Sequence, residues 1–203
     1  MKQTPIEIGR LLRSSLTGFV AGCRVNQPNL PVFGTLVRVP ISDQLEAFGL
    51  VYNIHMDDDG LVRQLVTSQV LPPEVIADNR DNRNMPIEIN IVTVGRRQAG
   101  VLSHLLPGHP ATSLDVIYQC SQAEICEFTS AGRLGYFRHI LRNEELQAGE
   151  LLAAHLEQAR EAHLAGGDPS WFKNAVKELI ILLRDDYPSL MGVLNALSDL
   201  PSE

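Results

Sequence analysis

Short runs of aliphatic and β-branched residues alternate with turn-forming residues up to about residue 130. Such runs, bounded by Gly, Pro, Asn or Asp, are typical of β-strands. The clearest is IEINIVTVGRR at residues 87–97, in which β-branched side chains recur throughout. The pattern predicts four further strands, at residues 19–25, 31–41, 46–56 and 114–121.

The strongest turn signals lie between the strands predicted at residues 46–56 and 87–97. An Asp-Asp-Gly sequence ending at Gly60 is typical of a tight turn, so residues 61–66 are predicted to return as the second strand of a β-hairpin. Pro73 suits the first turn of a helix. A short helical insert is therefore expected near 73–80, where a run of Asn, Asp and Arg ends it.

Beyond residue 132, Ala, Leu and Glu dominate at helical spacing, and three helices are predicted. Asn143 suits the N-cap of the first, with two glutamates in its first turn, where the helix dipole favours them. Asp168 suits the N-cap of the second, and the third follows Pro188. The second helix should bury an apolar face made of Trp171, Phe172, Val176, Leu179, Ile180 and Leu183.

These elements predict an α+β protein. Five to six short strands with one helical insert favour a small closed β-barrel at residues 1–131 over a sandwich. The helices at residues 132–203 are too short to be stable alone, so we expect them to pack on the barrel or on a second copy of the chain. The length of 203 residues, 44% of them hydrophobic, suffices for one sizeable core.

The composition and the length of the apolar runs predict where in the cell the protein acts. The longest uninterrupted apolar run, residues 179–183, is far too short to span a bilayer, so no membrane association is expected. The opening MKQTPIEIGR lacks the layout of a signal peptide. Three cysteines are an odd number and provide no disulfide framework. We therefore expect a reduced, cytoplasmic protein.

The net charge of −7 is unevenly distributed. The first hundred residues carry as many basic as acidic side chains, whereas residues 101–203 hold the whole negative excess. An acidic half repels phosphate backbones, so a nucleic-acid partner is not favoured. The basic residues that do cluster have acidic neighbours, and we retain them only as candidate partner-binding residues: Arg80, Arg83, Arg96 and Arg97.

The densest chemistry lies in HLLPGHPATSLDVIYQCSQAEICEF, residues 104–128. Two prolines hold its first part extended, which separates His104 from His109 by about 15 Å at roughly 3.3 Å per residue. Cys120 and Cys126 are also spaced more widely than the two to four residues typical of zinc-binding pairs. We therefore interpret the stretch as a stiff loop entering a strand, with two buried cysteines. His104 and His109 remain candidate partner-binding residues.

No catalytic constellation is evident in the sequence. The aspartates before Gly60 are contiguous, and no glutamate closes the loop as in a calcium-binding EF-hand. A G-x-S-x-G motif is absent, and no lysine follows a glycine, so a phosphate-binding P-loop cannot form. We predict no catalytic residues, no metal site, no cofactor and no nucleotide hydrolysis.

The strand section resembles the HAS barrel, the small β-barrel shared by HerA-type DNA-translocating ATPases and rotary ATP synthase subunits. The resemblance covers roughly residues 9–130. Its matching elements are FVAGCRV, FGTLVRV, FGLVYNI and INIVTVGRR, followed by the proline loop LPGHPATSLDVIY. The arrangement is also similar to standalone bacterial HAS-barrel proteins with a short helical C-terminus. This resemblance implies a fold and no activity. Because the sequence has no P-loop, the resemblance implies only the barrel's other role, which is to pack side by side with neighbours or to dock on a partner.

The favoured hypothesis is a non-catalytic protein-interaction or assembly module that binds a protein partner or itself. One alternative is a small-molecule or metal-dependent enzyme that uses the His104–His109 proline loop. Another is a nucleic-acid accessory factor that acts with a translocating ATPase through the four arginines.

Overall fold

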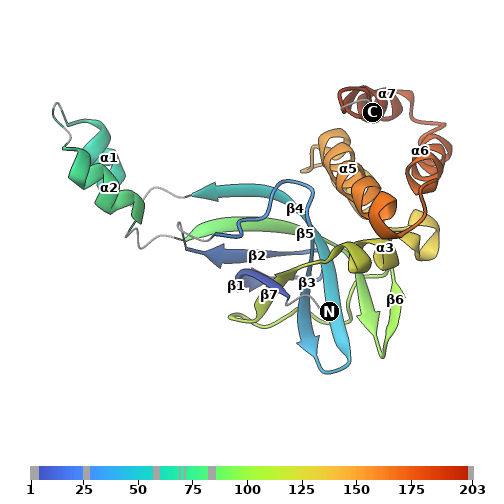
Figure 1. Cartoon of the computed structure of the whole chain (residues 1–203), viewed down its shortest axis with the longest axis horizontal. Coiled ribbons are helices and arrows are strands. Elements are labelled where there is room, and N and C mark those ends of the chain that lie inside the picture. The colour runs from blue at the N-terminus through green and yellow to red at the C-terminus, as the bar shows by residue number, and fades with distance from the viewer. Residues whose placement is uncertain are drawn as a thin grey trace.

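The computed structural model describes residues 5–24, 28–56, 60–68, 70, 72–81 and 86–200. Within these ranges six antiparallel strands close into a barrel, and helices follow toward the C-terminus, which confirms the predicted α+β class (Figure 1). Around the barrel the strands are β2 (Gly18–Cys23), β1 (Ile6–Ser14), β7 (Val116–Gln119), β3 (Leu36–Ser42), β4 (Leu45–Met56) and β5 (Ile87–Gln98), and β5 pairs back with β2. A short strand, β6 (Val101–Ser103), continues from β5 as a hairpin outside the closed circle.

The barrel is filled by its own side chains rather than hollow. Alternate residues point inward, as the two-residue period of strands requires. On β5, for example, Ile87, Ile89 and Ile91 join this interior cluster. The same cluster includes residues from every other barrel strand: Ile8, Leu11, Phe19, Ala21, Cys23, Val37, Val39, Ala47, Val51 and Ile117.

The strands β4 and β5 are buried on both faces along their middle sections. Their outward side chains, among them Phe48, Leu50, Val92 and Val94, belong to a second cluster, which extends into the helices. This double burial explains why their sequences are nearly continuous apolar runs rather than a strict alternation. The outer side of β4 and β5 is therefore the surface on which the helical part is built.

The prediction of a hairpin after Gly60 is wrong. Residues Leu61–Val66 form a helix, α1, and Gly60 at its start has a positive φ of 77°. The predicted helical insert near 73–80 is present as α2 (Pro73–Asp81), so the insert contains two helices rather than one. Both lie between β4 and β5 in sequence and extend away from the barrel, on the side opposite α5–α7 (Figure 1). Apolar residues four positions apart in LVRQLV form a helical pattern that the hairpin interpretation overlooked.

Several elements were not predicted, and two of them adjoin β7. The first, β1, pairs with β2 and β7 and breaks its register at two bulges, which interrupt the alternation that a sequence pattern would show. The second is a helix directly after β7, α3 (Gln122–Ser130). Ser121 and Glu124 form a reciprocal capping box at its start, which is a recognised sequence signature of a helix N-terminus. Cys126 therefore lies on a helix.

The helical part begins with a turn, η1 (Gly132–Leu134), and a short helix, α4 (Phe137–Leu141). The longest helix is α5 (Ala148–Gly166), which contacts α3, α6 (Trp171–Leu182) and α7 (Tyr187–Ser198). The prediction that Asn143 caps α5 is wrong, because the helix begins five positions later, at Ala148, and Gln147 occupies the N-cap position. The Asn143 side chain instead accepts a hydrogen bond from the backbone N–H of Glu145 in the preceding turn.

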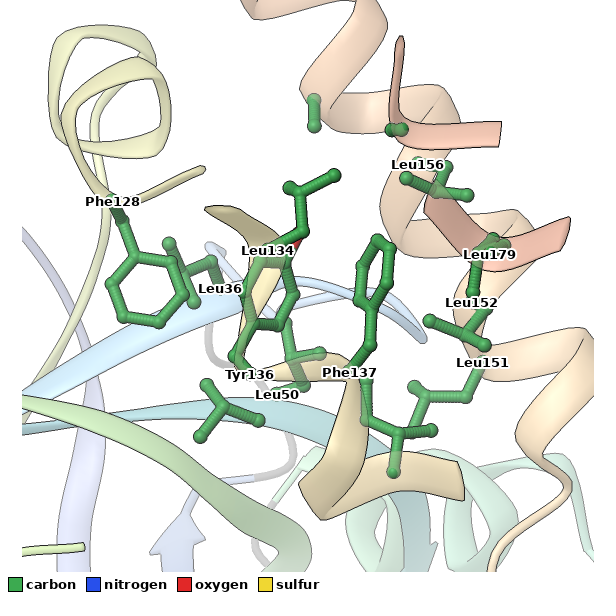
Figure 2. Packing of buried hydrophobic residues seen from close by; sticks show 14 of the residues in the cluster. Leu36, Leu50, Phe128, Leu134, Tyr136, Phe137, Leu151, Leu152, Leu156 and Leu179 are labelled. Atoms are coloured by element: carbon green, nitrogen blue, oxygen red, sulfur yellow. The ribbon is translucent and has the colours of Figure 1, made fainter. Parts of the chain in front are cut away.

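A single apolar cluster joins the outer side of the barrel to these helices. Phe128 of α3, together with Tyr136 and Phe137 around α4, fills the space between the strands and α5 (Figure 2). From there the cluster continues through the leucines of α5 to Leu179 of α6 (Figure 2). Burial of this kind stabilises by about 1.5–3 kcal/mol per large side chain, and it holds the helices against the barrel.

Candidate interaction surface on the helical subdomain

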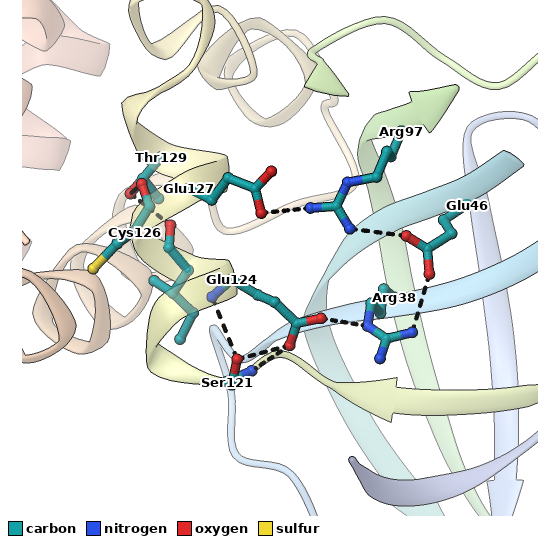
Figure 3. A network of polar contacts seen from close by, with 9 residues as sticks. Arg38, Glu46, Arg97, Ser121, Glu124, Cys126, Glu127 and Thr129 are labelled. Atoms are coloured by element: carbon teal, nitrogen blue, oxygen red, sulfur yellow. Dashed lines mark hydrogen bonds and ion pairs between the residues drawn. The ribbon is translucent and has the colours of Figure 1, made fainter. Parts of the chain in front are cut away.

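An ion-pair network attaches α3 to the barrel. Arg38 of β3 binds Glu124 of α3 at 2.7 Å and Glu46 of β4 at 3.1 Å. Arg97 of β5 binds the other oxygen of Glu46 at 3.0 Å and Glu127 of α3 at 2.6 Å (Figure 3). The carboxylates accept charge-assisted hydrogen bonds from two arginines on β3 and β5, the strands on either side of β4. The network thus sets the position of α3, and of the helices that pack on it.

This network accounts for one of the predicted partner-binding arginines. Arg97 is engaged by two carboxylates, which raise the pKa of its guanidinium against the opposing effect of burial. Arg96 is half-buried and donates to the backbone carbonyl of Leu106. Arg80 lies on α2, at the far end of the β4–β5 ribbon, and Arg83 lies outside the described residues. α2 precedes the start of β5, whereas Arg96 and Arg97 lie at its end, so the described backbone does not bring α2 together with these two arginines.

The two histidines of the proline loop are also separated. His104 is 5% exposed and lies among Phe128 and Tyr136, with ring centroids 4.9 Å away in each case. Its Nε2 donates to the carbonyl of Phe128 at 3.1 Å, and burial lowers its pKa, which favours the neutral ring. His109 is exposed. His104 is therefore a structural residue of the barrel–helix interface, and only His109 is accessible to a partner.

The predicted burial of two cysteines is correct for Cys120 and wrong for Cys126, which is half-buried on α3. Burial raises the pKa of both thiols, so neither is activated as a thiolate. Nowhere in the described ranges do three or more His, Cys, Asp or Glu side chains gather as a metal site would require.

A fully buried histidine fixes α5 to the start of β3. Nδ1 of His155 donates to the carbonyl of Gly34 at 3.3 Å, and the hydroxyl of Tyr136 donates to its Nε2 at 3.0 Å. Desolvation lowers the pKa of His155 to about 4. Gly34 has a φ of 82°, and a Cβ there would lie 2.8 Å from the backbone nitrogen of His155. A glycine is therefore needed for this close approach.

A second histidine fixes the start of α6. The indole ring of Trp171 stacks on His163 of α5, with centroids 4.7 Å apart and planes at 4°. The indole Nε1 donates to the carbonyl of Thr129 at 3.2 Å. Nε2 of His163 donates to the hydroxyl of Thr129 at 2.8 Å, and the backbone N–H of Asp168 donates to Nδ1. These contacts link α3, α5 and α6 in one polar and aromatic junction.

Opposite this junction, α6 exposes an apolar surface. Trp171, Ala175, Leu179 and Leu183 recur every four residues and are buried, as the helical period predicts for one face. Between Leu179 and Leu183, three consecutive aliphatic residues are exposed: Ile180 at 42%, Ile181 at 57% and Leu182 at 50%. Tyr187, at the start of α7, is 69% exposed.

Charged residues divide the exposed face of α6 into two stripes at helical spacing. Asn174, Glu178, Ile181 and Asp185 recur at intervals of four, three and four residues. Lys173, Lys177, Ile180 and Arg184 follow the same spacing one position earlier. Successive positions on a helix differ by about 100°, so within α6, which ends at Leu182, Glu178 lies on a different side of the outer face from Lys173 and Lys177. Arg184 and Asp185 follow the helix and form an ion pair with each other at 3.1 Å. We call the first set the acidic stripe and the second the basic stripe.

A small pocket of about 280 Å³ adjoins the acidic stripe. Its wall includes Trp171, Asn174 and Glu178 of α6, with Asp168 just before that helix. Residues at the end of α3 and in η1 complete the lining: Thr129, Ser130, Arg133 and Leu134. Asp168 carries a lowered pKa because the hydroxyl and the backbone N–H of Ser170 both donate to its carboxylate.

No protein-family model matches this chain, and no curated protein matches it either. Within the described ranges no helix combines the length and the apolar character needed to cross a bilayer.

Sequence reasoning placed Trp171 and Leu179 in the core of the tail but did not identify the α6 surface as a site. Ile180 was even assigned to the buried face. The signal was available in part, because the five consecutive apolar residues Leu179–Leu183 exceed what one buried face of a helix needs. The pocket carried no sequence signal, because its residues come from three elements.

Proposed function

We propose that this protein is a non-catalytic protein-interaction module, acting in the cytoplasm, in which the barrel is a rigid base and α6 presents the binding surface. The observation that carries the proposal is the exposed aliphatic run Ile180–Leu182 on a helix whose opposite face is already buried. Contiguous exposed apolar surface on a soluble domain marks sites of protein association. The resemblance of the strand section to HAS barrels, which pack side by side or dock on partners, agrees with this role.

The supporting base is rigid for identifiable reasons. The barrel interior is filled, and α3 is held by the network of Arg38, Glu46 and Arg97. His155 and Trp171 each make buried hydrogen bonds between elements distant in sequence. A surface held in this way loses little conformational entropy on binding, which favours affinity.

The test compares Ile181→Glu with Val101→Glu in the full chain. Val101 on β6 is 69% exposed and is distant from α6, so it is a matched control for an added surface charge (Figure 1). Affinity capture from the native host and sedimentation velocity together measure association with other proteins and with itself. We expect Ile181→Glu to abolish association and Val101→Glu to preserve it. Association that is equally retained by both variants, each folded by circular dichroism, would contradict the proposal.

A further inference from the structure

We infer that the α6 surface recognises a basic segment of a partner polypeptide, with one lysine or arginine side chain inserted into the Trp171 pocket. This inference rests on the proposed function and adds the chemistry of the partner. Three features of the described structure support it: the size of the pocket, the charge around it and the apolar residues beside it.

The pocket is suited to a single side chain. Its volume of about 280 Å³ is just below the range for small-molecule sites, which are typically about 300–1,000 Å³. Trp171, which is 6% exposed and stacks one face on His163, forms part of the wall and offers an apolar surface to the stem of a side chain. A long side chain with an apolar stem and a cationic end satisfies both the indole and the polar rim.

The charges near the pocket favour a cation. Asp168 and Glu178 both line it. Asp168 is exposed and Glu178 is half-buried. The wider field has the same sign, because residues 101–203 carry the whole net charge of −7. Such a field increases the encounter rate with basic partners and discriminates against acidic ones.

One residue of the pocket opposes this preference. Arg133 also lines it, is exposed, and has a left-handed backbone with a φ of 48°. Its positive charge should weaken binding of a cation, which makes Arg133 a useful test position. Asparagine tolerates left-handed dihedrals better than most residues, so Arg133→Asn removes the charge with little backbone cost.

The apolar residues determine what surrounds the inserted side chain. Ile181 and Leu182 follow the pocket along α6 and are 57% and 50% exposed. A partner segment with aliphatic residues on either side of its basic one would cover them. A basic and aliphatic segment therefore matches the surface better than a purely basic one, and its apolar contacts would persist in salt while its charge contacts weaken.

The experiment measures binding of three short peptides with the same leucine pattern, whose polar positions are all lysine, all glutamine or all glutamate. Trp171 is the only tryptophan in the chain, so its fluorescence reports directly on the pocket. We expect the lysine peptide to bind and to change the emission of Trp171, the glutamine peptide to bind at least about five-fold more weakly, and the glutamate peptide not to bind.

Variants of the full chain assign the effect to the pocket. Glu178→Gln should weaken the lysine peptide by about five-fold, and Arg133→Asn should strengthen it by a similar factor. Two control variants should not weaken binding. Glu74→Gln removes the same charge from α2, at the opposite end of the molecule (Figure 1). Lys177→Gln removes a positive charge from the basic stripe. Equal binding of the lysine and glutamine peptides, or equal effects of Glu178→Gln and Glu74→Gln, would overturn the inference. The proposed function is tested separately. It would still hold if Ile181→Glu abolished association, and it would be wrong if association did not depend on Ile181.

Discussion

Replacing Trp171 by alanine is the most direct test of how the helical part is held to the barrel. Trp171 is only 6% exposed, stacks on His163 and donates its indole N–H to the carbonyl of Thr129. If these contacts are as the structure describes them, the side chain is a core residue. Its loss should then unfold the whole molecule more easily rather than affect only its surface.

The magnitude follows from the contacts that are lost. Truncating a buried aromatic residue to alanine typically costs about 3–5 kcal/mol, including the cavity that remains. The loss of the indole donor leaves the Thr129 carbonyl without this partner and adds about 1 kcal/mol at most. We expect the free energy of unfolding to fall by about 4 kcal/mol. For a chain of this length that corresponds to a melting temperature lower by roughly 8–16 °C.

The assay is urea and thermal unfolding followed by far-ultraviolet circular dichroism, because the variant has no tryptophan left to report by fluorescence. Trp171→Phe keeps an aromatic ring in place and removes the N–H donor, so it should cost about 1–2 kcal/mol. Ile181→Ala on the exposed side of the same helix should change stability by no more than about 0.5 kcal/mol. A Trp171→Ala protein that melts like the wild type would refute the reasoning, whether or not it still associates.

Two further predictions concern buried polar groups. The pKa of His155 is about 4 in the native state against about 6.5 in the unfolded chain, so below pH 6.5 the unfolded state binds a proton that the native state does not. The free energy of unfolding, measured with urea, should therefore fall by about 3 kcal/mol between pH 7 and pH 4. A His155→Gln variant with the same pH dependence as the wild type would contradict this prediction. Arg38 and Glu124 lie 2.7 Å apart with side chains 14% and 25% exposed, so a double-mutant cycle with Arg38→Met and Glu124→Gln should give a coupling of about 1–2 kcal/mol. Additive effects of the two substitutions would show that the pair does not hold α3.

The accuracy of the sequence predictions depended on how local each signal was. The strand at residues 87–97 was predicted correctly because β-branched side chains restrict their own χ1 rotamers and favour strands. Residues 61–66 were misassigned because a six-residue apolar pattern is compatible with either a strand or a helix. The α3 helix could have been found from Ser121 and Glu124, whose capping box is a local signal. The α5 helix was placed too early because an Asn followed by glutamates is also typical of a turn.

By itself, the sequence determined the α+β class, the closed barrel and the helical part that follows, because periodicity and turn residues act over a few positions. Tertiary structure alone decided which polar residues are accessible. His104 is buried and His109 is exposed, although five positions apart, because aromatic rings from α3 and α4 cover only the first. Tertiary structure also left one face of α6 uncovered and brought Arg133 to the same pocket as Glu178. Exposure and proximity depend on packing between elements far apart in the chain, and that packing has no local sequence pattern.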